Sequence, residues 1–435
     1  MNQRLTSSVR ALVGCLLVQL VLGFQDIRML GSGIQGWQIV AGGGLFLLAI
    51  APTLGRLRVN NVTYAWSALF AYSLVWTLIA YHQTGGLWIG GSSNLFFGLS
   101  LLTFGMTLNP DLRRRWVVCI LIGYFALNIL AGIVEITLGN AALIAFHETK
   151  YSAGGRLRML ASEPSHIYAP FIVGLALLWQ AMPRGRMRNL ILIGPFLVAS
   201  ASKALLPVSF LAFVITERLV HLRKIPRHAR WVGRTFILSA VGLVFLLAVP
   251  FYVANRHEIS WSGEVMRSID EMPVGDVSSF LTRGALFADS ALVIARHPVL
   301  GVGPGKSSSA ILSQAESTGL ITPEILFYAQ DAPNFITSKT IALDLLVNYG
   351  VPVIIVSWIT FSYALRRAGN KPVIFALFTI LIGAFVTQGY NVWAWLALCI
   401  LSVNFESARQ SCSRNKVDVR FRRVFRGRSA KTPIA

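Results

Sequence analysis

Apolar runs of about 17–25 residues recur from one end of this 435-residue chain to the other. As an α-helix, one such run is long enough to cross the roughly 30 Å hydrocarbon core of a bilayer. Apolar residue types make up 54% of the chain and charged types only 13%, and the mean hydropathy is +0.62. A chain of this composition cannot cover itself with polar surface as a soluble globule does. The sequence therefore predicts an integral membrane protein. Because alternating segments are too few for a barrel, it predicts a bundle of helices.

The apolar runs can be placed as twelve membrane spans. They lie near residues 9–27, 34–54, 63–81, 87–108, 116–138, 166–182, 189–201, 204–221, 233–254, 345–365, 372–388 and 390–406. The stretch 189–221 is long enough to form one helix, but clusters of arginine and lysine flank it on both sides. Because short loops rich in these residues stay in the cytoplasm, we expect two crossings there, with an outer turn at 200–203.

The charge distribution orients this map. Most of the 39 lysines and arginines fall on the side that holds both termini, and most of the 18 acidic residues fall on the other side. The positive-inside rule then predicts that both termini face the cytoplasm. No small-residue cleavage site follows the first apolar run, so we expect it to be retained as a membrane helix. The basic tail should bind anionic lipid head groups rather than nucleic acid, because no aromatic platform or recognition motif accompanies it.

The map divides the chain into four parts. Residues 1–254 hold nine spans, with a polar outer loop at 139–165. Residues 255–340 form a second large outer segment whose apolar residues recur at helical spacing, so we expect a loop of short helices there. Residues 341–408 hold the last three spans, and 409–435 form the basic tail. The predicted fold is an all-α polytopic membrane protein with about twelve transmembrane helices.

Two common kinds of site are disfavoured by spacing. The sequence GVGPGK at 301–306 resembles a phosphate-binding loop, but its glycine spacing is wrong by one residue and no strand precedes it. We expect the glycines to supply turn conformations after a helix that ends near His297 and Pro298. The seven histidines are scattered without partners at ligand spacing, so no metal site and no cofactor are predicted.

Four motifs occur in a characteristic order. They are Glu-Pro-Ser at 163–165, Ser-Lys at 202–203, TRGALFADSALVIARHPVLGVGPG at 282–305 and PNFITSKTIALDLLVNYGVPVII at 333–355. Together with the twelve-helix map, they resemble the bacterial O-antigen, capsule and exopolysaccharide polymerases of the O-antigen polymerase–ligase superfamily. The resemblance covers roughly residues 150–390, and order and topology carry most of it.

The resemblance implies a metal-independent glycosyltransferase of the bacterial inner membrane, with the outer side facing the periplasm. Such a protein takes a glycan from an undecaprenyl-diphosphate carrier and transfers it to an acceptor sugar on a second carrier-linked glycan. Polymerisation of repeat units into O-antigen, capsule or exopolysaccharide would follow. A flippase and a chain-length regulator are the expected protein partners.

This chemistry predicts a role for the arginines and lysines of the outer segments. The diphosphate leaving group develops negative charge, which arginine can meet with two-point hydrogen bonds. The candidates for diphosphate binding are Arg156, Arg158, Lys203 and Arg283, and further candidates for substrate contact are Arg296, His297 and Asn334. The alternative is that Arg156 and Arg158 are interfacial residues that reach toward phospholipid head groups, and that Lys203 extends outward from a helix start.

The catalytic candidates are Glu163 and His166. A carboxylate in apolar surroundings can accept the proton of the attacking hydroxyl, but nearby arginines would lower its pKa. Glu163 could instead orient the sugar or cap the helix that begins at the following proline. His166 is the second base candidate, because its ordinary pKa suits neutral pH.

The choice between polymerase and ligase depends on a missing histidine. Ligases of the superfamily carry a His-Asn pair before a helix that ends near a glycine, and the corresponding place here reads Ala332-Pro333-Asn334, with Gly350 downstream. This favours a polymerase, with O-antigen ligase as the alternative. A flippase or transporter is third, because we find no internal repeat and no charged groups at midplane.

Overall fold

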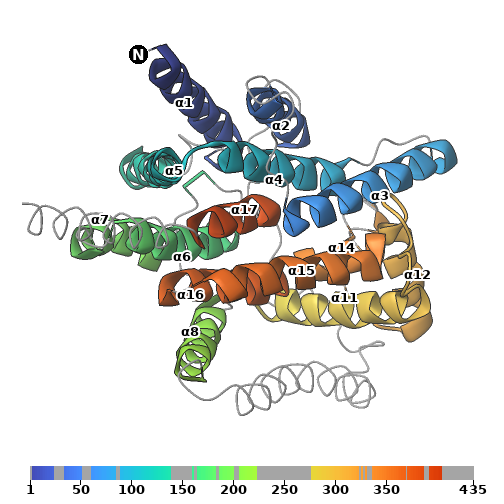
Figure 1. Ribbon diagram of the computed structural model, residues 1–435. Coiled ribbons are helices and arrows are strands. Elements are labelled where there is room, and N and C mark those ends of the chain that lie inside the picture. The colour runs from blue at the N-terminus through green and yellow to red at the C-terminus, as the bar shows by residue number, and fades with distance from the viewer. Residues whose placement is uncertain are drawn as a thin grey trace, which may run out of the picture.

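The computed structural model describes most of the chain, and every regular element in the described part is a helix (Figure 1). The described residues are 2–23, 34–50, 60–84, 89–138, 159–160, 164–182, 186–199, 205–222, 276–322, 325–326, 329–330, 336–368, 370–386 and 391–403. Their helices are α1 (Asn2–Leu22), α2 (Ile34–Ile50), α3 (Asn61–Thr84), α4 (Gly90–Thr107), α5 (Pro110–Leu138), α6 (Pro164–Ala181), α7 (Arg186–Ala199), α8 (Leu205–Leu222), α11 (Asp276–Arg296), α12 (Ser307–Thr318), α14 (Ile341–Tyr349), α15 (Val351–Arg367), α16 (Lys371–Ala384) and α17 (Val392–Val403).

Helix α17 lies at the centre of a bundle. All of its residues are buried, and it packs against α4, α5, α6, α15 and α16 (Figure 1). Its sequence VWAWLALCILSV is apolar on every face, as expected of a helix enclosed by other helices. Around it, α2 covers α4, and α16 packs against both α6 and α8.

The outside of the bundle is also apolar. Large exposed apolar side chains recur on α3, α5, α7, α8 and α15, among them Leu78, Ile136, Ile191, Phe210 and Trp358. A water-soluble protein rarely exposes contiguous apolar surface of this kind. Two helical stretches, Asn61–Gln83 and Pro110–Leu138, are long and apolar enough to cross a membrane. These features support membrane association.

Helices form at eleven of the twelve predicted spans, and 233–254 lies outside the described residues. That these helices cross a bilayer stays a prediction. The interpretation of 189–221 as two helices, α7 and α8, is confirmed. Helix α5 begins earlier than its apolar run, at Pro110, because Asn109 accepts a hydrogen bond from the Leu112 amide and caps its first turn.

The prediction of one continuous helix at 345–365 is wrong. The chain forms α14 and α15 there, separated by Gly350, whose φ of 63° lies in the left-handed region. The local sequence does carry a signal for the break, because Gly350 followed by Pro352 is typical of the end of one helix and the start of the next. The apolar run that continues past it hides this signal from a search for spans. A Cβ at Gly350 would lie 2.6 Å from the Val299 carbonyl oxygen and 2.7 Å from the Gly301 nitrogen. The break thus accommodates a distant segment of backbone.

Arginines cap helices at one end of the bundle. The last turn of a helix leaves carbonyl groups without intrahelical donors, and a guanidinium can satisfy several of them. Buried Arg113, in the first turn of α5, does so for the end of α4. The contacts of this kind join Arg10 to Leu48, Arg113 to Gly105, Met106 and Leu108, and Arg114 to Ala181. We call this the basic end.

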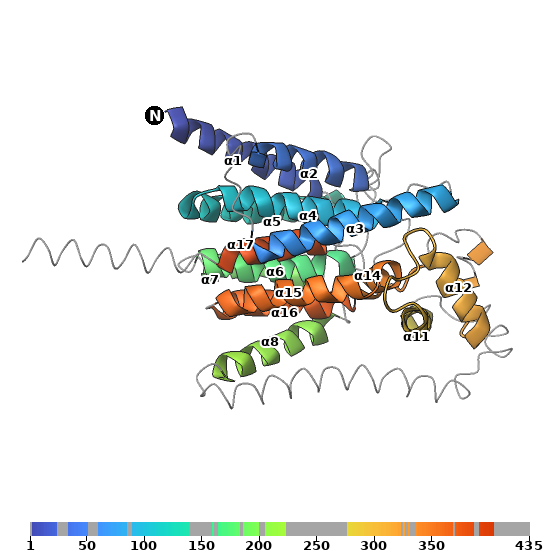
Figure 2. The same cartoon turned by 45° about the vertical axis from the view of Figure 1, so that its right-hand side comes forward.

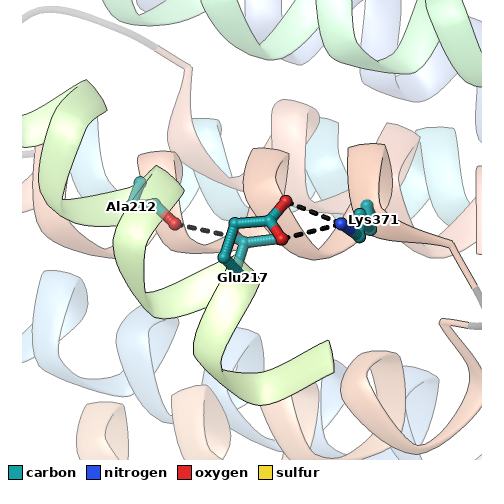
Figure 3. Close-up of polar contacts among 4 residues, drawn as sticks. Ala212, Glu217 and Lys371 are labelled. Carbon is teal, nitrogen blue, oxygen red and sulfur yellow. Dashed lines mark hydrogen bonds and ion pairs between the residues drawn. The ribbon is translucent and has the colours of Figure 1, made fainter. Parts of the chain in front are cut away.

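An ion pair joins two more helices at the basic end. Lys371, the first residue of α16, donates to both carboxylate oxygens of Glu217 near the end of α8, at 2.8 and 2.7 Å (Figure 3). Their side chains are 54% and 43% exposed, so the pair contributes at most about 1 kcal/mol to stability. The pair shows how the two helices are aligned, because it brings the end of α8 to the start of α16.

A buried chain of amides and hydroxyls joins three helices at the opposite end. Gln38 of α2 donates to Asn391, at the start of α17, over 2.6 Å. The Ser93 hydroxyl of α4 donates to the side-chain amide oxygen of Gln38 over 2.6 Å. Such buried groups need partners in an apolar interior, and here they supply one another. The starts of α2, α4 and α17 are therefore held together without charge.

Candidate functional site

The predicted site residues fall into two groups. Arg156, Arg158, Glu163, Lys203 and Asn334 lie outside the described residues, and their assigned roles stay predictions. Those within the described part are His166, in the first turn of α6, Arg283 and Arg296, in α11, and His297, directly after α11.

Helices α11, α12 and α14 gather at the end of the bundle opposite the start of α1 (Figure 2). They enclose a small apolar cluster separate from the main core, formed by the buried residues Ala285, Leu286, Ile311, Ile325 and Ile336. The described parts of the chain before α14 thus pack on one another at these residues. We call α11, α12, α14 and their connections the end unit.

The glycine-rich turn at 301–306 connects α11 to α12 and docks on α14. The Val302 amide donates to the Val347 carbonyl over 2.7 Å, and the Gly303 amide donates to the Asn348 carbonyl over 3.1 Å. Gly301, Gly303 and Gly305 all have positive φ, and α11 ends at Arg296, as the sequence predicted. Because the amides of Val302 and Gly303 donate to these carbonyls, they are not available to a phosphate.

Two glycines allow backbone to pack directly on backbone. A Cβ at Gly301 would lie 2.6 Å from the Val347 carbonyl oxygen. Gly350 meets the same turn from the other side, and the Val351 amide donates to the Pro298 carbonyl over 3.0 Å. The α14–α15 break and the turn after α11 are therefore complementary parts of one junction.

Substituting Gly301 should disrupt this junction, and Gly319 provides a matched control. Both have positive φ, 71° and 72°, but a Cβ at Gly319 would meet nothing within 4 Å. Gly319→Ala should cost about 1 kcal/mol from backbone strain alone. Gly301→Ala should cost at least about twice that, because a backbone contact must also separate. Thermal unfolding of the two purified variants checks this. Equal losses would contradict the docking described here.

Helix α3 holds the junction against the bundle. The Tyr72 hydroxyl donates to the Leu300 carbonyl over 3.0 Å and lies 3.3 Å from the Tyr349 carbonyl oxygen. The Trp76 indole donates to the same hydroxyl over 2.7 Å, and its ring lies 2.9 Å from the Cβ position of Gly303. The end unit is thus attached to the bundle through a defined set of contacts.

Arg283 lies half-buried in α11, beside residues that fix its backbone. Its neighbour Thr282 is fully buried, and the Thr282 hydroxyl lies 2.8 Å from that of Thr322. Ala285 and Leu286 pack in the small cluster together with Ile336. The segment that begins at Ile336 therefore adjoins the part of α11 that carries Arg283.

That adjoining segment presents a second cation, Lys339, which the sequence analysis did not select. Lys339 has φ of 59°, a conformation that side-chain-bearing residues adopt at a cost of about 1–2 kcal/mol. The turn around it is fixed, because the Ser338 amide and hydroxyl both donate to one oxygen of Asp344 over 2.8 Å. Thr340 caps α14 through the Leu343 amide. The sequence Ser-Lys-Thr followed by Asp344 was the available signal.

Arg296 does not share a location with Arg283. Arg296 is the last residue of α11, whereas Arg283 lies 13 residues before it, or about 20 Å away along the axis. Arg296 and His297 are both exposed. The structure thus places Arg283 on the part of α11 that adjoins the segment beginning at Ile336, and away from the two other described candidates for substrate contact, Arg296 and His297.

Asp289 of α11 is a buried acid that the sequence analysis did not select, and it lies where α12 packs on α11. It is 0% exposed, one carboxylate oxygen accepts a hydrogen bond from Thr318 over 2.9 Å, and the other has no partner. Burial raises the pKa of Asp289 to about 7, and the hydrogen bond from Thr318 opposes this rise. Amphipathic spacing alone cannot reveal such a group, because the sequence does not show that α12 covers it.

This pKa predicts a stability that falls with pH. The folded protein keeps the proton that an unfolded chain releases above its ordinary value of 3.8. Stability should therefore decline as pH rises from about 4 to about 7, by up to about 1.4 kcal/mol per unit, and then level off. Asp289→Asn should flatten the decline, and Glu316→Gln, an exposed acid of α12, should not. Melting curves at pH 5 and pH 8 separate the two.

The end unit therefore carries Arg283 and Lys339 on segments that share the small apolar cluster. Cations of this kind can bind a phosphate-bearing group through charge-assisted hydrogen bonds. Among the described residues, no group of three His, Cys, Asp or Glu side chains gathers as a metal site. No protein-family model matches the chain, and no curated protein matches it at a significant level.

Proposed function

We propose that this protein polymerises lipid-diphosphate-linked oligosaccharide repeat units into O-antigen, capsule or exopolysaccharide chains. The reaction is a glycosyl transfer at the periplasmic face of the bacterial inner membrane. The observation that carries the proposal is the junction: the two longest motifs, 282–305 and 333–355, are packed on each other through the bonds at Val302, Gly303 and Val351. Motifs that meet in space are what a shared site requires.

The proposed chemistry balances without an added reactant. A hydroxyl of the acceptor sugar attacks the anomeric carbon of the donor glycan, and the bond from that carbon to the carrier diphosphate breaks. The carrier diphosphate leaves with the bonding electron pair, and the hydroxyl proton passes to a base, for which Glu163 and His166 are the candidates. Fixed cations offset the charge that develops on the leaving group.

The proposed cations are Arg283, Arg156, Arg158 and Lys203, to which we add Lys339. A guanidinium binds two phosphate oxygens in one plane, whereas an ammonium acts as a point charge. Arg283 is half-buried on a helix that packs against α12 and α14, so its position is defined before substrate binds. Preorganised charge of this kind stabilises a transition state more than mobile charge does.

The proposed topology has twelve spans, with the basic end in the cytoplasm and the end unit in the periplasm. The arginines that cap α2, α4 and α6 support this orientation, because basic residues favour the cytoplasmic side. Anionic lipids would bind the basic tail, and a flippase and a chain-length regulator would act beside the protein. O-antigen ligase remains the alternative activity.

The glycans of a deletion strain test this function. Without the polymerase, single repeat units should still be attached to their acceptor, because synthesis, export and ligation of the unit are intact. Without a ligase, no unit would be attached to lipid A-core. The chain-length pattern is read by gel electrophoresis or mass spectrometry, and expression of the wild-type chain should restore long chains. Normal chain lengths in the deletion strain would contradict the proposal.

A further inference from the structure

The turn after α11 presents two apolar side chains to the outside. Val299 is 64% exposed and Leu300 is 52% exposed, although both lie at the junction described above. Their backbone is held in place. The Gly301 amide donates to the His297 carbonyl over 3.1 Å, and the Pro298 carbonyl accepts from Val351 over 3.0 Å. A fixed turn cannot hide these side chains by folding inward.

We call Val299 and Leu300 the tip. Its level along the long axis of the bundle follows from α3 and α15, which lie side by side. Asn60 bonds to Tyr363 and Trp66 bonds to Thr360, both on α15. Tyr72 contacts the last residue of α14, directly before α15, and the turn itself. The tip is therefore at the level of Tyr72 along α3.

Helix α3 continues past that level, and its exposed side chains there are apolar, as on a surface that faces lipid. Val75, Leu78 and Ile79 are exposed apolar residues that lie up to seven positions beyond Tyr72, or about 10 Å along the axis. If the bilayer covers these residues, it also covers the level of the tip. On the other flank, Ile354 and Ile355 of α15 continue the exposed apolar surface.

Several backbone groups of the turn have the partners that non-helical backbone needs in a bilayer. Polar backbone groups cannot remain without partners in hydrocarbon. Here the amides of Gly301, Val302 and Gly303 donate to carbonyls, and the Leu300 carbonyl accepts from Tyr72. The exposed side chains of Val299 and Leu300 are apolar, and they are flanked by the exposed side chains of Arg296 and His297 on one side and Lys306 on the other. Anionic head groups would complement Arg296 and Lys306.

We propose that the turn is re-entrant, with Val299 and Leu300 inserted into the hydrocarbon of the leaflet on the side of the end unit. Bilayer lipid is the partner of this surface. The insertion would hold the last turn of α11 at the level of the head groups and fix the height of the end unit above the bundle. It rests on membrane placement of the bundle and is independent of the proposed glycosyl transfer.

Depth-dependent quenching tests the proposal on the full chain. Cys15, Cys119, Cys399 and Cys412 are first replaced, and single cysteines are then introduced as Val299→Cys or Leu300→Cys. Each carries an environment-sensitive fluorophore, in nanodiscs of phosphatidylethanolamine and phosphatidylglycerol with or without brominated acyl chains. Leu78→Cys, on the exposed face of α3, is the lipid reference, and Ser313→Cys, exposed on α12, is the water reference.

We expect the labels at 299 and 300 to show blue-shifted emission and a loss of fluorescence with brominated lipid comparable with that at 78. Aqueous iodide should quench the label at 313 and leave those at 299 and 300 unaffected. Tip labels that behave like the one at 313, while 78 is quenched by lipid, would overturn the insertion alone. Tip labels protected from both quenchers would mean that protein covers the tip. An unquenched label at 78 would remove the membrane placement as well.

Discussion

Arg283→Ala should abolish chain elongation while leaving the protein folded. The side chain is half-buried in α11, and the proposed partner is a desolvated diphosphate, so its loss removes charge-assisted hydrogen bonds that strengthen in the transition state. We expect a loss of about 2–4 kcal/mol of transition-state stabilisation, which is roughly a 30- to 1,000-fold fall in rate. Transfer by the purified protein with a lipid-diphosphate repeat unit measures it.

Two comparisons sharpen this result. Arg283→Lys keeps the charge but not the two-point geometry, so it should remain badly impaired. Arg115→Ala removes an exposed arginine at the basic end and should leave activity near normal. Protein level and melting temperature are recorded for each variant. A folded Arg283→Ala protein that makes chains of normal length would rule out a role for this residue in diphosphate binding.

Glu163→Gln should lower the rate by about 100- to 10,000-fold if Glu163 is the base or orients the acceptor sugar. Glutamine keeps the size and much of the hydrogen bonding of the side chain but loses its charge. The position directly precedes α6, which begins at Pro164, so a purely capping role is the competing explanation. In that case the same change should cost only about 1 kcal/mol of stability and leave chain length nearly unchanged.

The outcome of this substitution decides the next one. An active Glu163→Gln protein would eliminate the carboxylate as the base, and His166→Ala would then test the histidine one turn further along. If Glu163→Gln is inactive but melts normally, its charge is required for the reaction. Measuring melting temperature beside transfer keeps a folding defect from being read as a catalytic one.

The residues of the end unit differ in how far the sequence alone predicts them. Arg283 could be selected from the sequence because its motif and its chemistry both pointed to a phosphate, and its role stays a prediction. Lys339 was missed because its left-handed conformation depends on the turn that Ser338 and Asp344 build. Asp289 was missed because its spacing on an amphipathic helix is ordinary, and only the docking of α12 removes it from water.

The sequence by itself determined the helices. Once a long apolar run leaves water, its backbone groups can find partners only within a helix. The positions of the runs therefore predict α1 to α8 and α15 to α17, and most helix ends lie within a few residues of the predicted ones. Basic clusters on both sides of 189–221 correctly divided it into two helices. These are local properties, set by composition over about twenty residues.

Only the tertiary structure decided the junction. Gly350 and Pro352 mark a local helix end, but the sequence does not show what the break accommodates. In the structure, the turn at Gly301 approaches it within backbone contact distance. The two glycines are 49 positions apart, and neither reveals the other in the sequence. Burial of Asp289, the conformation of Lys339 and the exposure of the Val299–Leu300 tip depend likewise on which distant segments pack together. Periodicity can tell which face of a helix is apolar, but not what covers it.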